Sequence, residues 1–281
     1  MKATKYLGAF LIFTVGMLTS CTTAHGALKV TPTASAVKEQ KAEPTPSIKV
    51  IPAPLIEVPI KKPAPKPVAL PKLPKNAPAL IPVVRQACDE LWPTIPYCSF
   101  MASKIEQESC ISLTHSKCWS PYAELKTARE YGFGLGQITV AYNKNGTERF
   151  NVWKDLIKKD KTLKDKWTWE NRFDAPMQIR ASFIKSKMSF DSIRFQVADI
   201  TEHMAFGAVT YNSGSVLIDR RLCIDVKGCD PSKWFGNVEL YSSKSRIAQK
   251  GYGKSFFEIS REYPKNILFV RRPKYVPYLD Q

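Results

Sequence analysis

A proline-rich segment near the N-terminus limits which part of this 281-residue chain can fold. Thirteen of the 21 prolines lie between residues 27 and 84, where no glycine occurs and lysines recur among alanines and valines. Proline lacks a backbone donor and favours the extended polyproline II conformation, so this segment cannot build a packed core. We therefore predict a disordered tether over residues 21–85 and a single folded domain over residues 86–281.

The first twenty residues have the layout of a secretory signal peptide. Two lysines precede an apolar core over residues 7–18, which is too short to span a membrane. Leu18-Thr19-Ser20-Cys21 then resembles the lipobox of bacterial lipoproteins. The resemblance implies a signal peptide over residues 1–20, lipidation of Cys21 and a lipid anchor in the membrane. Because Thr22 follows rather than aspartate, it also implies an outer-membrane lipoprotein facing the periplasm of a Gram-negative cell. A plain signal peptide with an incidental cysteine is the alternative.

Positive charge is spread over both predicted parts of the exported chain. Residues 21–85 carry ten basic and three acidic side chains, a net charge of +7, and residues 86–281 carry +8. An exported chain meets little nucleic acid, whereas the peptide carboxylates of peptidoglycan and anionic lipid headgroups are abundant polyanions there. We therefore expect peptidoglycan glycan strands and the membrane as partners, and no nucleic acid. A solvated basic surface without a partner is the alternative, and the composition identifies no protein partner.

Six cysteines remain in the folded domain once Cys21 is set aside. An oxidising compartment favours disulfides over metal binding, and fifteen pairings of six cysteines are possible. Short loops close most readily, which favours the sequential pairing. Zinc is a weak alternative, because only His115 and His203 lie in the domain and no cysteine pair has the Cys-x2-Cys spacing of zinc sites. We predict no metal and no cofactor. The even pairing also argues against a cysteine peptidase. The predicted disulfides are Cys88–Cys98, Cys110–Cys118 and Cys223–Cys229.

Residues 99–109 have the apolar spacing of a helix that carries a carboxyl group on its apolar side. Met101, Ile105 and Glu108 fall at i, i+4 and i+7, so Glu108 shares the apolar stripe, while Glu106 is expected on the opposite, solvated side. A desolvated carboxyl has a raised pKa and can hold a proton for a leaving glycosidic oxygen. The alternative is a buried carboxylate satisfied by arginine or by backbone donors.

Two further blocks carry groups suited to binding a sugar. Gly134-Leu135-Gly136-Gln137-Ile138 combines glycines, which allow close approach of the backbone, with an amide that can bond N-acetyl or hydroxyl groups. Asp199 and Glu202 form a capping-box pattern for a helix that ends with Tyr211-Asn212-Ser213-Gly214, where Gly214 suits a left-handed cap.

In this order, Glu108-Ser109 and these two blocks resemble the soluble-lytic-transglycosylase branch of the lysozyme superfamily. The resemblance covers roughly residues 95–265. It implies a mainly α, lysozyme-like α+β domain that cleaves the β-1,4 bond between N-acetylmuramic acid (MurNAc) and N-acetylglucosamine (GlcNAc) and forms a 1,6-anhydro ring. Glu108 would be the catalytic acid and base, and Tyr211 would help to position it. The implied substrate-binding residues are Ser109, Gly134, Leu135, Gln137, Tyr211 and Asn212.

Departures from the family pattern keep other reactions open. The 25 residues between Glu108 and Gly134 exceed the usual family spacing, and Gly136 replaces the family's methionine. Glycosidases usually work with two carboxylates. Glu130 is a possible second one, which would make the domain a muramidase that hydrolyses the same bond, although its predicted helical context suits a surface residue. A non-catalytic peptidoglycan-binding scaffold is the remaining alternative.

The C-terminal region is predicted to contain one further helix, from about residue 251 to 263. Arg271-Arg272-Pro273-Lys274 follows it and is expected to be a loosely held basic end.

Overall fold

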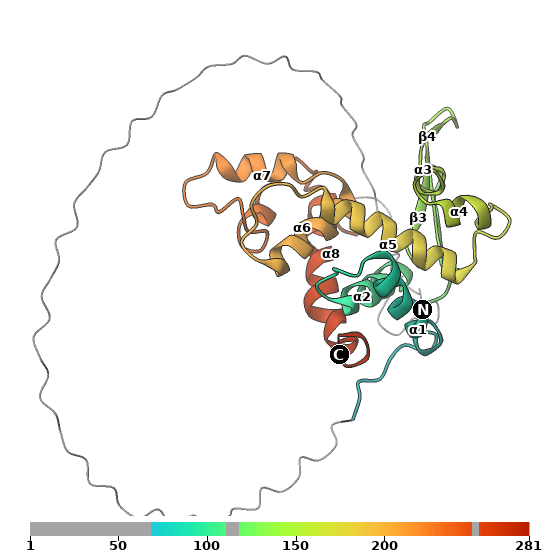
Figure 1. Cartoon of the computed structure of the whole chain (residues 1–281). Coiled ribbons are helices and arrows are strands. Elements are labelled where there is room, and N and C mark those ends of the chain that lie inside the picture. The colour runs from blue at the N-terminus through green and yellow to red at the C-terminus, as the bar shows by residue number, and fades with distance from the viewer. Residues whose placement is uncertain (1–68, 111–117, 249–252, 281) are drawn as a thin grey trace, which may run out of the picture. The chain divides into compact units, whose positions relative to one another are not determined.

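The computed structural model describes residues 69–110, 118–248 and 253–280. The predicted signal peptide, Cys21 and nearly all of the predicted tether lie outside these residues. The described chain is mainly helical with one small sheet, which confirms the predicted mainly α class (Figure 1). No helix in these ranges has the length and apolar character needed to cross a membrane.

In the described ranges, helices precede and follow a single antiparallel sheet. The four strands pair in sequence order, from β1 to β4. The elements are α1 (Ala77–Leu91), α2 (Cys98–Ser109), β1 (Glu124–Lys126), β2 (Glu130–Phe133), β3 (Ile138–Tyr142), β4 (Glu148–Asn151), α3 (Val152–Lys159), α4 (Lys161–Lys166), α5 (Ala175–Asp191), α6 (Ile200–Ser213), α7 (Leu217–Ile224), η1 (Val238–Leu240), α8 (Phe256–Lys265), η2 (Asn266–Arg271), η3 (Arg272–Lys274) and α9 (Val276–Leu279).

The folded domain begins earlier than predicted. Helix α1 starts at Ala77, and Ala77, Ile81 and Val84 are buried in the main core. A proline near the N-terminus of α1 is tolerated because the first helical N–H groups have no partner within the helix. Asn76 also donates to the carbonyl of Cys118 at 3.0 Å. The boundary at residue 85 is therefore wrong, because apolar spacing at i, i+4 and i+7 outweighs proline content here.

Two apolar clusters hold the domain together, and α5 contributes to both. The main cluster includes residues of α1, α2, α5, α6 and α8. The second lies between the sheet and α3–α4, with Phe133, Ile138, Leu156 and Trp167 at its centre. Ile179 of α5 belongs to the main cluster, and Ala181 of α5 belongs to the second. Figure 1 shows α5 running between the helical part and the sheet. Helix α5 is thus a shared support for the sheet and for α2.

The strand register places Glu130 in the sheet rather than in a helix. Glu130 pairs with Ala141 and Gly132 pairs with Thr139 across β2 and β3. Side chains alternate along a strand, so Glu130 and Gly132 share one face, while Phe133 points into the second apolar cluster on the other. Glu130 is also buried. The prediction of a helical surface residue is therefore wrong, because cross-strand pairing overrides the local helical spacing.

All three predicted disulfides are present in the structure. The Cα atoms of Cys88–Cys98, Cys110–Cys118 and Cys223–Cys229 lie 5.9, 4.3 and 5.5 Å apart. The sequential pairing is therefore confirmed. Within the described ranges, no group of three or more histidine, cysteine or acidic side chains is arranged to hold a metal ion.

The C-terminal segment packs against α2 instead of forming a loose end. Helix α8 continues directly into the π-helical η2, whose last residue, Arg271, is buried. The partners of Arg271 are Glu106 and Gln107 of α2, more than 160 residues earlier in the chain. The predicted loose basic end is wrong because its positive charges have acidic and amide partners that only the tertiary fold brings close.

Candidate active site

Glu108 lies in the last turn of α2 and is only 6% exposed. The chain leaves the helix at Cys110, which has extended backbone angles and is joined to Cys118. Ser109 fixes this exit: its hydroxyl donates to the Ile105 carbonyl at 2.6 Å and accepts the Trp119 N–H at 2.8 Å. Both hydrogen bonds use the hydroxyl within the protein, so Ser109 holds the C-terminal end of α2 in the described structure.

The phenol of Tyr263 donates a hydrogen bond to Glu108 Oε1. Tyr263 belongs to α8 and is almost fully buried. The sequence analysis did not identify this residue, because 155 residues separate it from Glu108. Its hydroxyl orients one carboxyl oxygen and leaves the second oxygen available for a proton.

Burial raises the pKa of the Glu108 carboxyl above its ordinary value. The positive charge of Lys104, the hydrogen bond from Tyr263 and the charge of Lys185 oppose this shift, but desolvation outweighs them. The raised pKa keeps the carboxyl protonated to a higher pH than a solvated glutamate. This is the property required of a general acid.

Tyr211 joins the third sequence block to the second. Its hydroxyl donates to the Gly136 carbonyl at 2.7 Å, although 75 residues separate the two. Burial raises the pKa of Tyr211 well above its usual value, and the negative charge of Glu108 raises it further. A Cβ on Gly136 would lie only 3.1 Å from Ser182 and 3.2 Å from the Tyr211 hydroxyl. The glycine that departs from the family pattern therefore suits this close contact.

The Gly134–Leu135 backbone is held by an amide of α5. Gln178 accepts the Leu135 N–H at 2.9 Å. Gly134 has a positive φ of 75°, and a Cβ there would come within 2.3 Å of the Gln178 side chain. The Leu135 side chain is fully buried in the main core. These two residues therefore shape the loop through their backbone, because neither has a side chain available for a ligand.

Two amide side chains, one in the second sequence block and one in the third, keep unused hydrogen-bonding groups. Gln137 donates to the Gly134 carbonyl at 3.2 Å, but its buried Oε1 has no partner in the described part of the chain. Both amide atoms of Asn212 are buried and equally lack a hydrogen-bond partner there. Buried polar groups without partners are costly. Gln137 and Asn212 are therefore predicted site residues whose buried amides keep unpaired polar atoms in the described residues.

The helix that carries Tyr211 and Asn212 begins and ends where the sequence predicts. Asp199 caps it by accepting the Glu202 N–H at 3.0 Å, and Gly214 ends it with a φ of 81°. Glu202 does not close the predicted capping box. Its carboxylate instead accepts N–H groups of Trp234 and Phe235, which fixes the loop after α7 against the start of α6.

Glu130 forms a separate ion pair within the sheet region. Arg149 lies 3.3 Å from its carboxylate. Burial raises the pKa of the Glu130 carboxyl above its ordinary value, although the charges of Arg149 and Arg129 oppose this shift. Both carboxyls therefore have a raised pKa, but Glu130 lies beside arginines, whereas Glu108 lies beside lysines and Tyr263.

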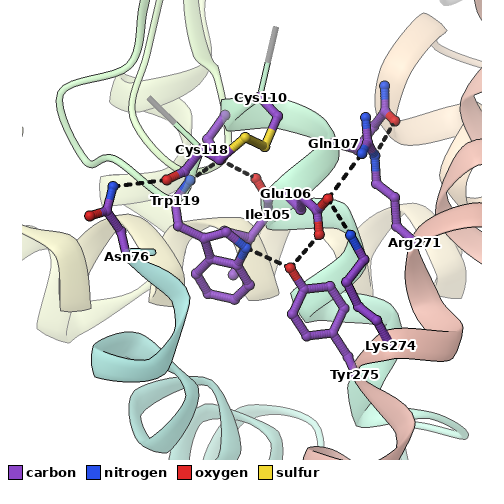
Figure 2. Close-up of a disulfide and its surroundings, with 11 residues drawn as sticks. Asn76, Ile105, Glu106, Gln107, Cys110, Cys118, Trp119, Arg271, Lys274 and Tyr275 are labelled. Atoms are coloured by element: carbon purple, nitrogen blue, oxygen red, sulfur yellow. Dashed lines mark hydrogen bonds and ion pairs between the residues drawn. A yellow bond between two sulfur atoms is a disulfide. The ribbon is translucent and has the colours of Figure 1, made fainter. Parts of the chain in front are cut away.

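Glu106 is a buried structural residue, which contradicts its predicted solvated position. It is completely buried, and its carboxylate accepts hydrogen bonds from Arg271 at 3.1 Å, Lys274 at 2.6 Å and Tyr275 (Figure 2). The Trp119 indole donates to the Tyr275 hydroxyl at 2.7 Å. The prediction fails because every residue of α2 is buried, so neither side of this helix faces solvent.

Comparison with protein-family models and with curated protein sequences finds no match for the chain.

Proposed function

We propose that the domain is a peptidoglycan lytic transglycosylase that cleaves the β-1,4 bond between MurNAc and GlcNAc. The observation that carries the proposal is the protonatable Glu108 carboxyl, buried at the end of α2 and oriented by Tyr263. The hydrogen bond between Tyr211 and Gly136 supports it further, because it brings the other two sequence blocks together. The sequence also suggests export as a lipoprotein, which would hold this acid near the cell wall.

In the proposed reaction, Glu108 acts first as an acid and then as a base. Its proton passes to the glycosidic oxygen while the bond from that oxygen to C1 of MurNAc breaks. The 6-hydroxyl oxygen of the same sugar then bonds to C1, and its proton returns to Glu108. The products are a 1,6-anhydro-MurNAc end and a free GlcNAc 4-hydroxyl, so a second carboxylate is not required. The unpaired amide atoms of Gln137 and Asn212 would bond N-acetyl and hydroxyl groups of the substrate after a local movement, because they are inaccessible to solvent in this structure.

Digestion of purified sacculi tests the reaction directly. The mature chain with intact disulfides is expected to release soluble muropeptides, and mass spectrometry is expected to find 1,6-anhydro-MurNAc ends on them. Sacculi incubated with heat-unfolded protein provide the control. Reducing MurNAc ends would instead identify a hydrolase, and binding to sacculi without soluble products would identify a non-catalytic scaffold.

Glu130→Gln is expected to retain the rate of muropeptide release within about threefold, because a single-acid reaction does not use this carboxylate. Initial rates of release from labelled sacculi measure the effect. Glu148→Gln is the matched control, since Glu148 pairs with Lys154 on the exposed part of the same sheet. A loss of about 100-fold or more in Glu130→Gln alone would contradict the single-acid reaction and favour the two-carboxylate muramidase.

A further inference from the structure

Two lysines at the candidate site turn their amines into the protein. Lys104 of α2 is fully buried. Lys185 of α5 is only partly buried as a residue, yet its Nζ is inaccessible to solvent. Lysines at a surface ordinarily cover apolar groups with the stem and extend the ammonium into water. In Lys185 the ammonium group points into the protein while part of the residue remains exposed, and this orientation requires an explanation.

Both amines lie against the ring of Tyr211. Nζ of Lys104 is 3.0 Å from the ring centroid, and Nζ of Lys185 is 3.6 Å from it. Lys104 is held further by Ser186 at 2.6 Å and by Ser182 at 3.2 Å. The amine of Lys185 has no hydrogen-bond partner in the residues that the structure describes. It therefore keeps its hydrogen-bonding capacity unused beside the ring.

The two amines, the two phenols and Glu108 form one buried group, which we call the Glu108 cluster. Lys104 precedes Glu108 by one turn of α2, Lys185 comes from α5, Tyr211 from α6 and Tyr263 from α8. Both lysines interact electrostatically with Glu108. Four helices thus contribute to the charge balance of a single carboxyl group.

Burial lowers the pKa of Lys185 to about 7, even though the charge of Glu108 acts in the opposite direction. Burial also lowers the pKa of Lys104 well below its ordinary value. A buried amine without a hydrogen-bond partner destabilises the fold. The proposed reaction contains a state of the site in which a positive charge here is favourable. Once Glu108 has given up its proton, its carboxylate is buried in surroundings that disfavour negative charge.

We propose that Lys185 is a positioning residue that stabilises the Glu108 carboxylate after proton transfer. Lys104, fixed by two serines, is the constant member of the pair, and Lys185 is the adjustable one. The Tyr263 hydroxyl supplies the hydrogen bond and the amines supply the positive charge. This role rests on the proposed function, because it concerns the charged form of the acid that the reaction creates.

Lys185→Met tests the role, with Lys187→Met as the matched control on the same helix. Lys187 is solvent-accessible and pairs with Asp191 on the surface. We expect Lys185→Met to lower kcat for muropeptide release by roughly 10- to 100-fold at the wild-type optimum, since a preorganised charge is lost. The alkaline limb of the rate profile should move to higher pH, because the Lys185 charge lowers the Glu108 pKa. Lys187→Met should change neither.

Stability supplies a readout that a merely structural lysine would not give. Between about pH 7 and its ordinary pKa of 10.5, Lys185 is protonated in the unfolded chain and neutral in the folded one. The unfolded state therefore binds more protons, and wild-type stability rises with pH across this window. Lys185→Met should raise the melting temperature most at or below pH 7, and the gain should disappear near pH 10. A variant that is both less active and less stable, with an unmoved alkaline limb, would overturn the role.

A carboxyl titration separates this inference from the proposed function. In protein labelled with ¹³C at the glutamate carboxyl groups, the Glu108 signal is assigned by its loss in Glu108→Gln. Its midpoint should lie at higher pH in Lys185→Met than in wild type or Lys187→Met. The titration needs no turnover, so it remains informative if sacculi are not cleaved and the proposed function fails. Equal midpoints in all three proteins would overturn the inference even if wild type releases muropeptides.

Discussion

Glu108→Gln is expected to lower the rate of muropeptide release by about 10³-fold, because glutamine cannot donate a proton to the glycosidic oxygen. The amide has nearly the shape of the protonated carboxyl, and its oxygen can still accept the Tyr263 hydroxyl. The fold should therefore survive the change. Initial rates on sacculi measure the loss, and circular dichroism with thermal unfolding verifies the fold.

The matched control for this experiment is Glu262→Gln. Glu262 lies on α8, close in sequence to Tyr263, and forms a solvent-exposed pair with Lys254. Its substitution should leave release unchanged, because exposed pairs contribute little. If Glu108→Gln releases muropeptides as fast as Glu262→Gln, Glu108 is not the acid and the proposed function is wrong.

Glu106→Gln is expected to destabilise the domain by about 3–5 kcal/mol, as measured by equilibrium unfolding in denaturant with the disulfides intact. The carboxylate is fully buried and compensates the charges of Arg271 and Lys274 (Figure 2). The Arg271 side chain is only 9% exposed. Removing the Glu106 charge leaves the Arg271 guanidinium without a buried counter-ion. The C-terminal segment should then separate from α2 at lower denaturant concentration.

A second substitution distinguishes lost charge compensation from poor packing. Arg271→Met in the Glu106→Gln background should recover part of the lost stability, because it removes the uncompensated cation. Glu262→Gln again serves as the control and should change the free energy of unfolding by at most about 1 kcal/mol. A Glu106→Gln variant as stable as this control would show that the buried ion pairs contribute no net stability.

Local signals were sufficient for several parts of the fold. The i, i+4 and i+7 spacing predicts α2, and Asp199 with Gly214 predicts both ends of α6. The disulfides were also predictable, because each joins cysteines at most ten residues apart, where loop closure is easiest. These predictions succeed because each depends on interactions within one short stretch of chain.

Predictions fail where the environment of a side chain depends on distant parts of the chain. Helical phase places Glu106 opposite Glu108, but α2 is covered on all sides, so both carboxyl groups are buried. Their roles differ because Glu106 compensates two cations, whereas Glu108 has a phenol on one oxygen and a raised pKa. Glu130 lies in a stretch with helical spacing, yet pairing with β3 makes it part of a strand.

One signal for the Glu108 cluster was present in the sequence. Lys104 lies four residues before Glu108, so the same helical phase that places Glu108 among apolar residues also buries a lysine. Lys185 and Tyr263 have no comparable signal. Tyr263 contacts the carboxyl from α8, and Lys185 lies from α5 against the Tyr211 ring, so their partners are defined only when the helices pack.

The sequence by itself determined the mainly helical class, the three disulfides and the helix that carries Glu108, because short-range spacing and loop closure control these features. The family resemblance also predicts that the blocks beginning at Glu108, Gly134 and Tyr211 belong to one site. The tertiary structure alone decided that Glu106 compensates two cations, that Glu130 pairs with arginine in the sheet, and that Glu108 has a raised pKa beside Tyr263 and two lysines. The physical reason is that desolvation and charge depend on atoms from distant segments, here the C-terminal Arg271 and Tyr263, and the Lys185 amine of α5.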